Sequence, residues 1–99
     1  MMNYEFLCSQ IRDIFGITET KLRDIHPTES FAINGFHSPF RRDREENRGG
    51  GILVYVRECI NCVRRKDLES DELENIWVEI KQPNSKSFLL YVLYRHPDA

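Results

Sequence analysis

The sequence predicts a small α/β (α+β) domain, and three observations support this fold class. Apolar residues near the N-terminus recur at i, i+3, i+4 and i+7, the spacing of one face of an amphipathic helix. A short β-prone run, 13–18, follows directly, so helix and strand form the αβ half of an α/β unit. At 99 residues, 40% of them hydrophobic and 30% charged, the chain fits one soluble domain and not two.

The predicted helix ends near Arg12, and the run 13–18 after it is predicted to be a strand buried on both faces. The apolar stripe of the helix consists of Tyr4, Leu7, Cys8 and Ile11. Residues 22–29, which include Pro27, are expected to form a loop. A long loop is predicted from His37 to Gly51, where no hydrophobic periodicity is found, and long loops within compact domains are usually functional.

The second half of the chain carries the clearest strand patterns. Residues 52–56, Ile-Leu-Val-Tyr-Val, are expected to form a central strand, and 60–63 a weaker one. Apolar residues alternate with Trp77 and Glu79 over 76–80, the period of a strand with one buried face, although the Trp77 ring is expected in the core. The run 88–94 returns as an apolar strand, which predicts an antiparallel hairpin.

Composition excludes several classes of protein. Fourteen Lys and Arg against sixteen Asp and Glu give a net charge of −2, which is not the basic excess of a free-standing nucleic-acid-binding module. No apolar run reaches the roughly 20 residues of a membrane span, and the N-terminus lacks the pattern of a signal peptide. We therefore expect an intracellular protein, in the nucleus or the cytoplasm, that is not secreted and contacts no membrane.

The three cysteines, Cys8, Cys59 and Cys62, are expected to be free thiols, because their number is odd and no secretion signal is present. Cys59 and Cys62 match a C-x-x-C pattern, but a structural zinc site needs a second pair of ligands, and the histidines do not have the usual spacing. Buried or half-buried thiols are favoured over metal or redox work.

Glu19 is the residue best placed for chemistry, because it follows a predicted strand and ligands gather at the carboxyl ends of strands in α/β sheets. Magnesium prefers hard oxygen ligands and binds through one or two carboxylates together with water and phosphate. Lys21 could reach the same place and contact a phosphate as a point charge. By spacing alone, a surface glutamate is the more common explanation.

Several short stretches raise the metal interpretation when they are taken together. Their shared order resembles the endonuclease/exonuclease/phosphatase family, in the form found ahead of the reverse transcriptase of non-LTR (LINE-type) retrotransposons. The stretches are Ile-Thr-Glu-Thr-Lys-Leu at 17–22, Arg-Arg-Asp-Arg at 41–44, Gly-Gly-Gly-Ile-Leu-Val-Tyr-Val at 49–56, Glu-Asn-Ile-Trp-Val-Glu-Ile at 74–80 and Tyr-Arg-His-Pro at 94–97. The resemblance covers roughly residues 11–97.

The resemblance implies a DNA endonuclease that hydrolyses a phosphodiester bond with Mg²⁺. Glu19 matches the Mg-binding glutamate, and Lys21 matches the basic residue often found two places later. Tyr94 matches the tyrosine that contacts the scissile phosphate in related apurinic/apyrimidinic endonucleases; the alternative is an aromatic residue that packs on its sheet. The loop with Arg41, Arg42 and Arg44 lies near the DNA in the family, so these residues are candidate phosphate contacts, with a solvated charged loop as the alternative.

The implied fold is part of an αββα sandwich, with mainly one mixed or antiparallel sheet and a short N-terminal helix. The family's early Asn, its later Asp and Asn pair and its near-terminal Asp and His have no recognisable match. Residues 1–99 are therefore expected to form a single truncated domain that lacks the first strand and the C-terminal half. We expect a fragment that is inactive alone and can self-associate through exposed sheet edges. The alternative is a degenerate, non-enzymatic remnant that binds nucleic acid or protein.

Overall fold

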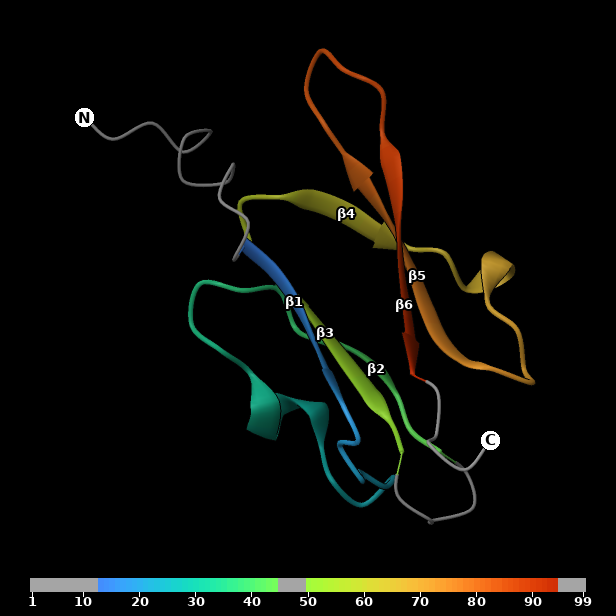
Figure 1. The fold of residues 1–99 in the computed structure, drawn as a ribbon. Helices are drawn as coiled ribbons and strands as arrows, with labels where there is room; N and C mark the ends of the chain where they lie inside the picture. Colours follow the sequence, from blue (N-terminus) through green and yellow to red (C-terminus); the bar gives the residue numbers. More distant parts are fainter. Residues whose placement is uncertain (1–12, 45–49, 95–99) are drawn as a thin grey trace.

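The computed structural model describes residues 13–44 and 50–94, which form two three-stranded antiparallel sheets (Figure 1). The first sheet has the order β1-β3-β2 and the second the order β4-β5-β6. The strands are β1 (Ile14–Thr18), β2 (Phe40–Arg42), β3 (Ile52–Val56), β4 (Asn61–Arg64), β5 (Glu74–Lys81) and β6 (Phe88–Tyr94), and two 3-10 turns are η2 (Thr28–Phe31) and η3 (Lys66–Leu68).

Strand β3 is the centre of the first sheet and is buried on both faces. All five of its residues are buried, as its unbroken run of β-branched and apolar residues predicts. It pairs with β1 from Ile14 opposite Val56 to Thr18 opposite Ile52, and with β2 on its other side. The prediction of a central strand at 52–56 is confirmed.

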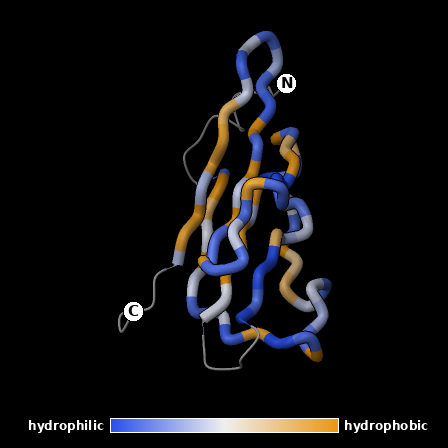
Figure 2. Tube along the Cα trace, turned by 90° about the vertical axis from the view of Figure 1, so that its right-hand side faces the viewer, coloured by the Kyte–Doolittle hydropathy of each residue, from blue (hydrophilic) through white to orange (hydrophobic). Residues whose placement is uncertain are grey.

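Strand β5 is the centre of the second sheet and is buried on one face. Its residues alternate, because Ile76, Val78 and Ile80 are buried while Trp77 and Glu79 are only half-buried. It pairs with β6 from Glu74 opposite Tyr94 to Ile80 opposite Phe88, so the predicted antiparallel hairpin is confirmed. Figure 2 shows the hydrophobic colour along β6 up to the hydrophilic turn that joins the two strands.

The core lies between the two sheets. Ile52, Val54 and Val56 of β3 form one buried cluster with the three isoleucine and valine residues of β5. Full burial of such a side chain contributes about 1.5 to 3 kcal/mol each, so these six residues are the main source of stability. Partly buried residues pack around this cluster from every other strand; they are Ile14, Phe40, Ile60, Cys62, Leu90, Val92 and Tyr94.

The segment between β1 and β2, residues 19–39, covers the outer face of the first sheet and is named the covering segment. Leu53 and Tyr55 point to that face and are 4% and 3% exposed. The Tyr55 hydroxyl donates a hydrogen bond of 2.6 Å to the carbonyl oxygen of Phe31 in η2. Phe15 stacks on Tyr55 and meets the Phe36 ring edge-on. Both faces of β3 are therefore covered without a helical layer.

The predicted fold class is wrong. The described residues contain two antiparallel sheets and no α-helix, so they do not form an αββα sandwich or an α/β unit with mainly one sheet. The physical reason is that the apolar face of β5 is buried against β3 of a second sheet, whereas the prediction had mainly one sheet with a short N-terminal helix. The predicted N-terminal helix at 4–12 lies outside the described residues.

Three local predictions also need correction. The run 13–18 was expected to be buried on both faces, but β1 is an edge strand, and Ile17 is 43% exposed. The predicted loop 37–51 contains the short strand β2, whose pairing with β3 overrides the weak β propensity of its two arginines. Trp77 is half-buried and stacks on Tyr91 with ring centroids 4.2 Å apart, so it is not a core residue.

The cysteines differ from each other. Cys62 is a free, half-buried thiol that packs against the core, as predicted, and burial raises its pKa. Cys59 is disulfide-bonded, so the prediction that all three thiols are free is wrong. An odd cysteine count excludes complete pairing but leaves one disulfide possible.

Candidate functional site

Glu19 and Lys21 lie directly after β1, where the backbone makes an unusual turn. Both residues have positive φ angles, of 56° and 57°, which are uncommon for residues other than glycine. Two backbone hydrogen bonds hold the turn against the residues before β3, from Thr20 N–H to the Gly51 carbonyl at 3.4 Å and from Lys21 N–H to the Gly50 carbonyl at 2.8 Å. The exposed Glu19 carboxylate is therefore presented by a fixed backbone at the strand end, as predicted from its position in the sequence.

Gly50 and Gly51 allow this close approach. Their φ angles are 76° and 97°, in the region that favours glycine. A Cβ atom on Gly51 would overlap the Thr20 hydroxyl, and one on Gly50 would lie 2.6 Å from the Glu74 carboxylate. These glycines serve as turn residues that let the chain enter the sheet.

Glu74, the first residue of β5, connects the two sheets beside this turn. Its carboxylate accepts a hydrogen bond of 2.8 Å from Gly51 N–H and forms an ion pair with Arg44. Burial alone would raise the pKa of Glu74, but the hydrogen bonds from Arg44 and Gly51 outweigh burial and lower it. Sequence reasoning did not single out Glu74 as a site residue, because its partners come from distant parts of the chain.

Tyr94, the last residue of β6, meets Glu19 at this end of the sandwich. Interaction with the Glu19 carboxylate, followed by burial, raises the pKa of the Tyr94 phenol, and the charge of Arg44 opposes that shift only in part. The Tyr94 hydroxyl is enclosed and has no well-formed hydrogen bond in the described part of the chain. The structure thus brings together two residues, 75 positions apart in the sequence, that the family resemblance assigns to one site.

The Thr20 hydroxyl is the second enclosed oxygen without a well-formed hydrogen bond among residues 13–44 and 50–94. It lies against Gly51, whose N–H is bound to Glu74. The cluster of Glu19, Thr20, Arg44, Glu74 and Tyr94 is called the strand-end site below. Two of its hydroxyl groups can still accept or donate hydrogen bonds, which is unusual for enclosed polar atoms.

The predicted arginine contacts are occupied within the molecule. The Arg41 guanidinium pairs with Asp43 at 2.8 Å and donates to the carbonyl oxygens of Arg23 and His26, which fixes the covering segment to β2. Arg44 pairs with Glu74. The role of Arg41, Arg42 and Arg44 in binding DNA stays a prediction.

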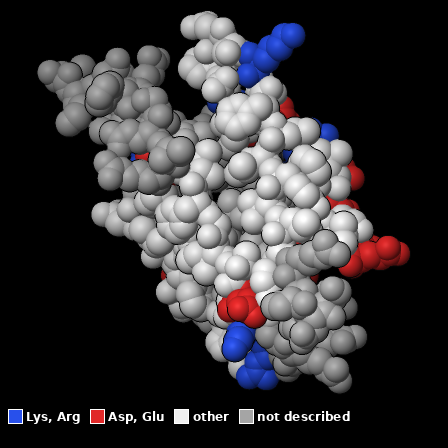
Figure 3. Space-filling model, viewed as in Figure 1, with Lys and Arg blue, Asp and Glu red and all other residues white. Residues whose placement is uncertain are grey.

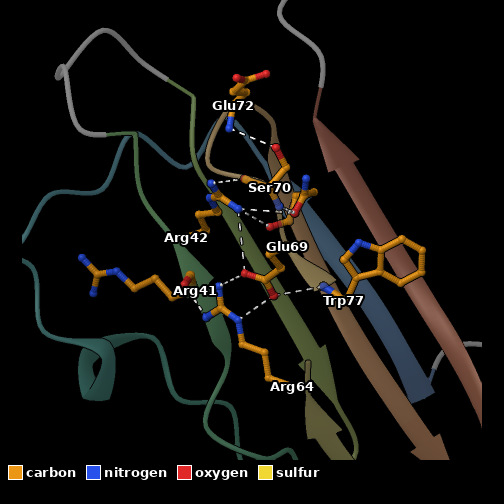
Figure 4. A network of polar contacts seen from close by, with 8 residues as sticks. Arg41, Arg42, Arg64, Glu69, Ser70, Glu72 and Trp77 are labelled. Carbon is orange, nitrogen blue, oxygen red and sulfur yellow. Dashed lines mark hydrogen bonds and ion pairs between the residues drawn. The ribbon is translucent and has the colours of Figure 1, made fainter. Parts of the chain in front are cut away.

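Arg42 and Glu69 belong to a polar network that joins β2, β4 and the segment before β5 (Figure 4). Arg42 donates to the Ser70 carbonyl at 2.6 Å and to the Asn75 carbonyl at 3.1 Å. Glu69 accepts two hydrogen bonds from Arg64, at 2.9 and 2.8 Å, and one from Trp77 N–H at 3.1 Å. This network closes the side of the sandwich and is structural.

The carboxylates available to a metal ion are few. The described residues contain no group of three or more His, Cys, Asp or Glu side chains that could hold one. Glu74 already accepts hydrogen bonds from Arg44 and Gly51, which leaves Glu19 as the exposed carboxylate of the strand-end site. Lys21 is exposed and starts from the same turn.

A separate polar pocket of about 520 Å³ opens in the covering segment. It is lined by Asp24, His26, Pro27, Thr28, Glu29, Arg41 and Asp43, and so by no residue of the strand-end site.

Figure 3 shows acidic and basic side chains scattered over one face, around a broad uncharged area. In the described part of the chain, no helix has the length and apolar character needed to cross a membrane.

Comparison with protein-family models, with curated proteins and with solved structures found no match to this chain.

Proposed function

We propose that this chain is a piece of a Mg-dependent phosphodiesterase, a DNA endonuclease of the retrotransposon type, that is inactive by itself. The observation that carries the proposal is the meeting of Glu19 and Tyr94 at one end of the sandwich. The family resemblance named these two residues from motifs at opposite ends of the chain.

Each residue of the proposed site has a chemical role. The exposed Glu19 carboxylate would hold Mg²⁺, and the metal would supply positive charge to a phosphate oxygen. The Tyr94 phenol, whose pKa is raised further above its ordinary value of 10, stays protonated at neutral pH and could donate a hydrogen bond to the same phosphate. Lys21 adds a positive charge at the rim of the site.

A single free carboxylate fits weak metal binding, since magnesium sites in proteins use one or two carboxylates with water and phosphate completing the shell. It does not also position an attacking water. We therefore expect the purified chain to leave supercoiled plasmid intact in the presence of Mg²⁺. Nicking that Glu19→Ala abolishes would contradict the inactivity of the fragment, while nicking that survives Glu19→Ala would indicate a contaminant.

The alternative function is a non-enzymatic remnant that binds nucleic acid or protein. It is favoured by the family motifs that have no match in this sequence. The internal contacts of Arg41, Arg42 and Arg44 serve the fold in either case. Genomic sequence around the coding region separates the two: an open frame that continues into the missing family motifs supports the enzyme fragment, and stop codons support the remnant. For the enzyme fragment, we further propose DNA as the partner of the parent domain, a location in the nucleus or cytoplasm, and self-association through sheet edges.

A further inference from the structure

Strand β6 forms one edge of the second sheet. The order β4-β5-β6 gives it β5 as its neighbour, and no strand pairs with its other side among the residues that the structure describes. An edge strand presents a row of backbone N–H and C=O groups that can pair with another strand. Natural proteins usually protect such an edge.

The usual protection is missing from β6. Its seven residues, Phe-Leu-Leu-Tyr-Val-Leu-Tyr, include no charged residue, no proline and no glycine. Leu89 and Leu93 are 47% and 45% exposed on its outer side, and Tyr91 between them is 39% exposed. The strand is long, apolar and open, which are the features of a strand that pairs with a second chain.

The sequence of β6 is complementary to itself in the antiparallel direction. When two copies are paired about Tyr91, Leu89 of each copy lies opposite Leu93 of the other, and Leu90 lies opposite Val92. Each pair matches one apolar residue with another, and the pairing keeps outer residues with outer residues and inner residues with inner ones. A two-fold interface of this kind needs the same patch on both copies, and β6 provides it.

We propose that two copies of this chain associate through β6, antiparallel and centred on Tyr91, into one continuous six-stranded sheet. The inference rests on the self-association included in the proposed function and specifies its strand, partner and register. A second copy is favoured over an unrelated strand because it places an apolar residue opposite each of Leu89, Leu90, Val92 and Leu93 with the faces matched. Phe88, 45% exposed, would gain cover beside Tyr94 of the other copy.

The experiment measures the mass of the full chain by sedimentation over a range of concentrations. The proposal expects mass to rise from 11.8 kDa toward twice that value. Leu89→Lys combined with Leu93→Lys places lysine opposite lysine twice, and should weaken dimerisation by about tenfold or more. Leu89→Lys combined with Leu93→Glu places lysine opposite glutamate in the same register, and should restore the dimer.

Val63→Lys is the matched control, since Val63 is 44% exposed on β4 at the opposite edge of the sheet. It should leave the mass unchanged. A chain that stays monomeric, a dimer that survives the double lysine change, a double lysine variant that the Lys/Glu pair does not rescue, or a dimer lost in Val63→Lys would each overturn the proposal. Denaturing gels without reductant show whether a doubled mass comes from disulfide cross-linking, which would also count against it. None of these results depends on Mg²⁺ or plasmid nicking.

Discussion

Glu69→Ala tests whether the polar network at the side of the sandwich holds the sheets together. The Glu69 side chain is 8% exposed, and its main partner Arg64 is 16% exposed, so the ion pair is largely removed from water. The substitution removes the carboxylate that pairs with Arg64 and accepts from Trp77 N–H, and among the described residues it leaves the Arg64 guanidinium only its hydrogen bond to the Arg41 carbonyl oxygen. Loss of one partner of a buried pair costs about 3 to 5 kcal/mol, because the other charge stays buried and unpaired.

Asp67→Ala is the matched control, because Asp67 also pairs with an arginine but is 60% exposed. Its pair with Arg65 lies in water, where ion pairs contribute little to stability. Urea unfolding monitored by tryptophan fluorescence measures both variants. With a urea m-value of about 2 kcal/mol/M, Glu69→Ala should lower the midpoint by about 2 M.

Glu69→Gln separates charge from shape, since the amide keeps an oxygen that can accept from Trp77 N–H. Its midpoint should fall between those of the native chain and Glu69→Ala. Equal midpoints for Glu69→Ala and Asp67→Ala, or a Glu69→Ala midpoint equal to that of the native chain, would refute the assignment of a structural role to this network.

Three further predictions follow from the site and its surroundings. Folding lowers the pKa values of Glu69 and Glu74 below their ordinary value of 4.5. The two ionised carboxylates therefore stabilise the folded chain above pH 4.5, and this stabilisation is lost as the pH falls through the lower folded values. A urea midpoint that stays constant below pH 4.5 would contradict this. Gly51→Ala should lower the free energy of unfolding by about 1 to 3 kcal/mol, because alanine is strained at the positive φ of this position. Gly16→Ala is the control and should have little effect, since its added Cβ lies 3.5 Å from Val92. Equal losses of stability in thermal unfolding would count against strain at Gly51. Glu19→Gln should lower the pKa of Tyr94 toward its ordinary value of 10, because a negative charge beside the phenol is removed. The exposed Glu72→Gln variant is the control. The same Tyr94 titration by NMR in both variants would contradict a contact between Glu19 and Tyr94.

Sequence patterns predicted the strands better than the way in which they combine. The alternation over 76–80 and the apolar run 52–56 identify β5 and β3, because burial of one or both faces leaves a period in the residues themselves. The pattern does not say what covers the buried face. Packing of β3 on β5 joins residues that are far apart in the sequence, so the two-sheet arrangement was missed and mainly one sheet with a short helix was expected.

The same distinction applies to the strand-end site. Glu19 could be identified from its position after a strand, and the motif order connected it with Tyr94. Glu74 was missed because its role depends on Gly51 and Arg44, which only the folded chain brings near it. The internal partners of Arg41 were equally invisible in a sequence where alternating charges suggest a solvated loop.

Titration with Mg²⁺ followed by NMR tests the central claim most directly, namely that Glu19 and Tyr94 belong to one metal-dependent site. The account predicts weak, saturable shifts that are largest at the amides of Glu19, Thr20 and Lys21 and at the Tyr94 ring, and that disappear in Glu19→Gln. The pocket at Asp24 and Glu29 provides the internal comparison, because it offers carboxylates outside the site. Shifts confined to that pocket, or unchanged in Glu19→Gln, would contradict the account.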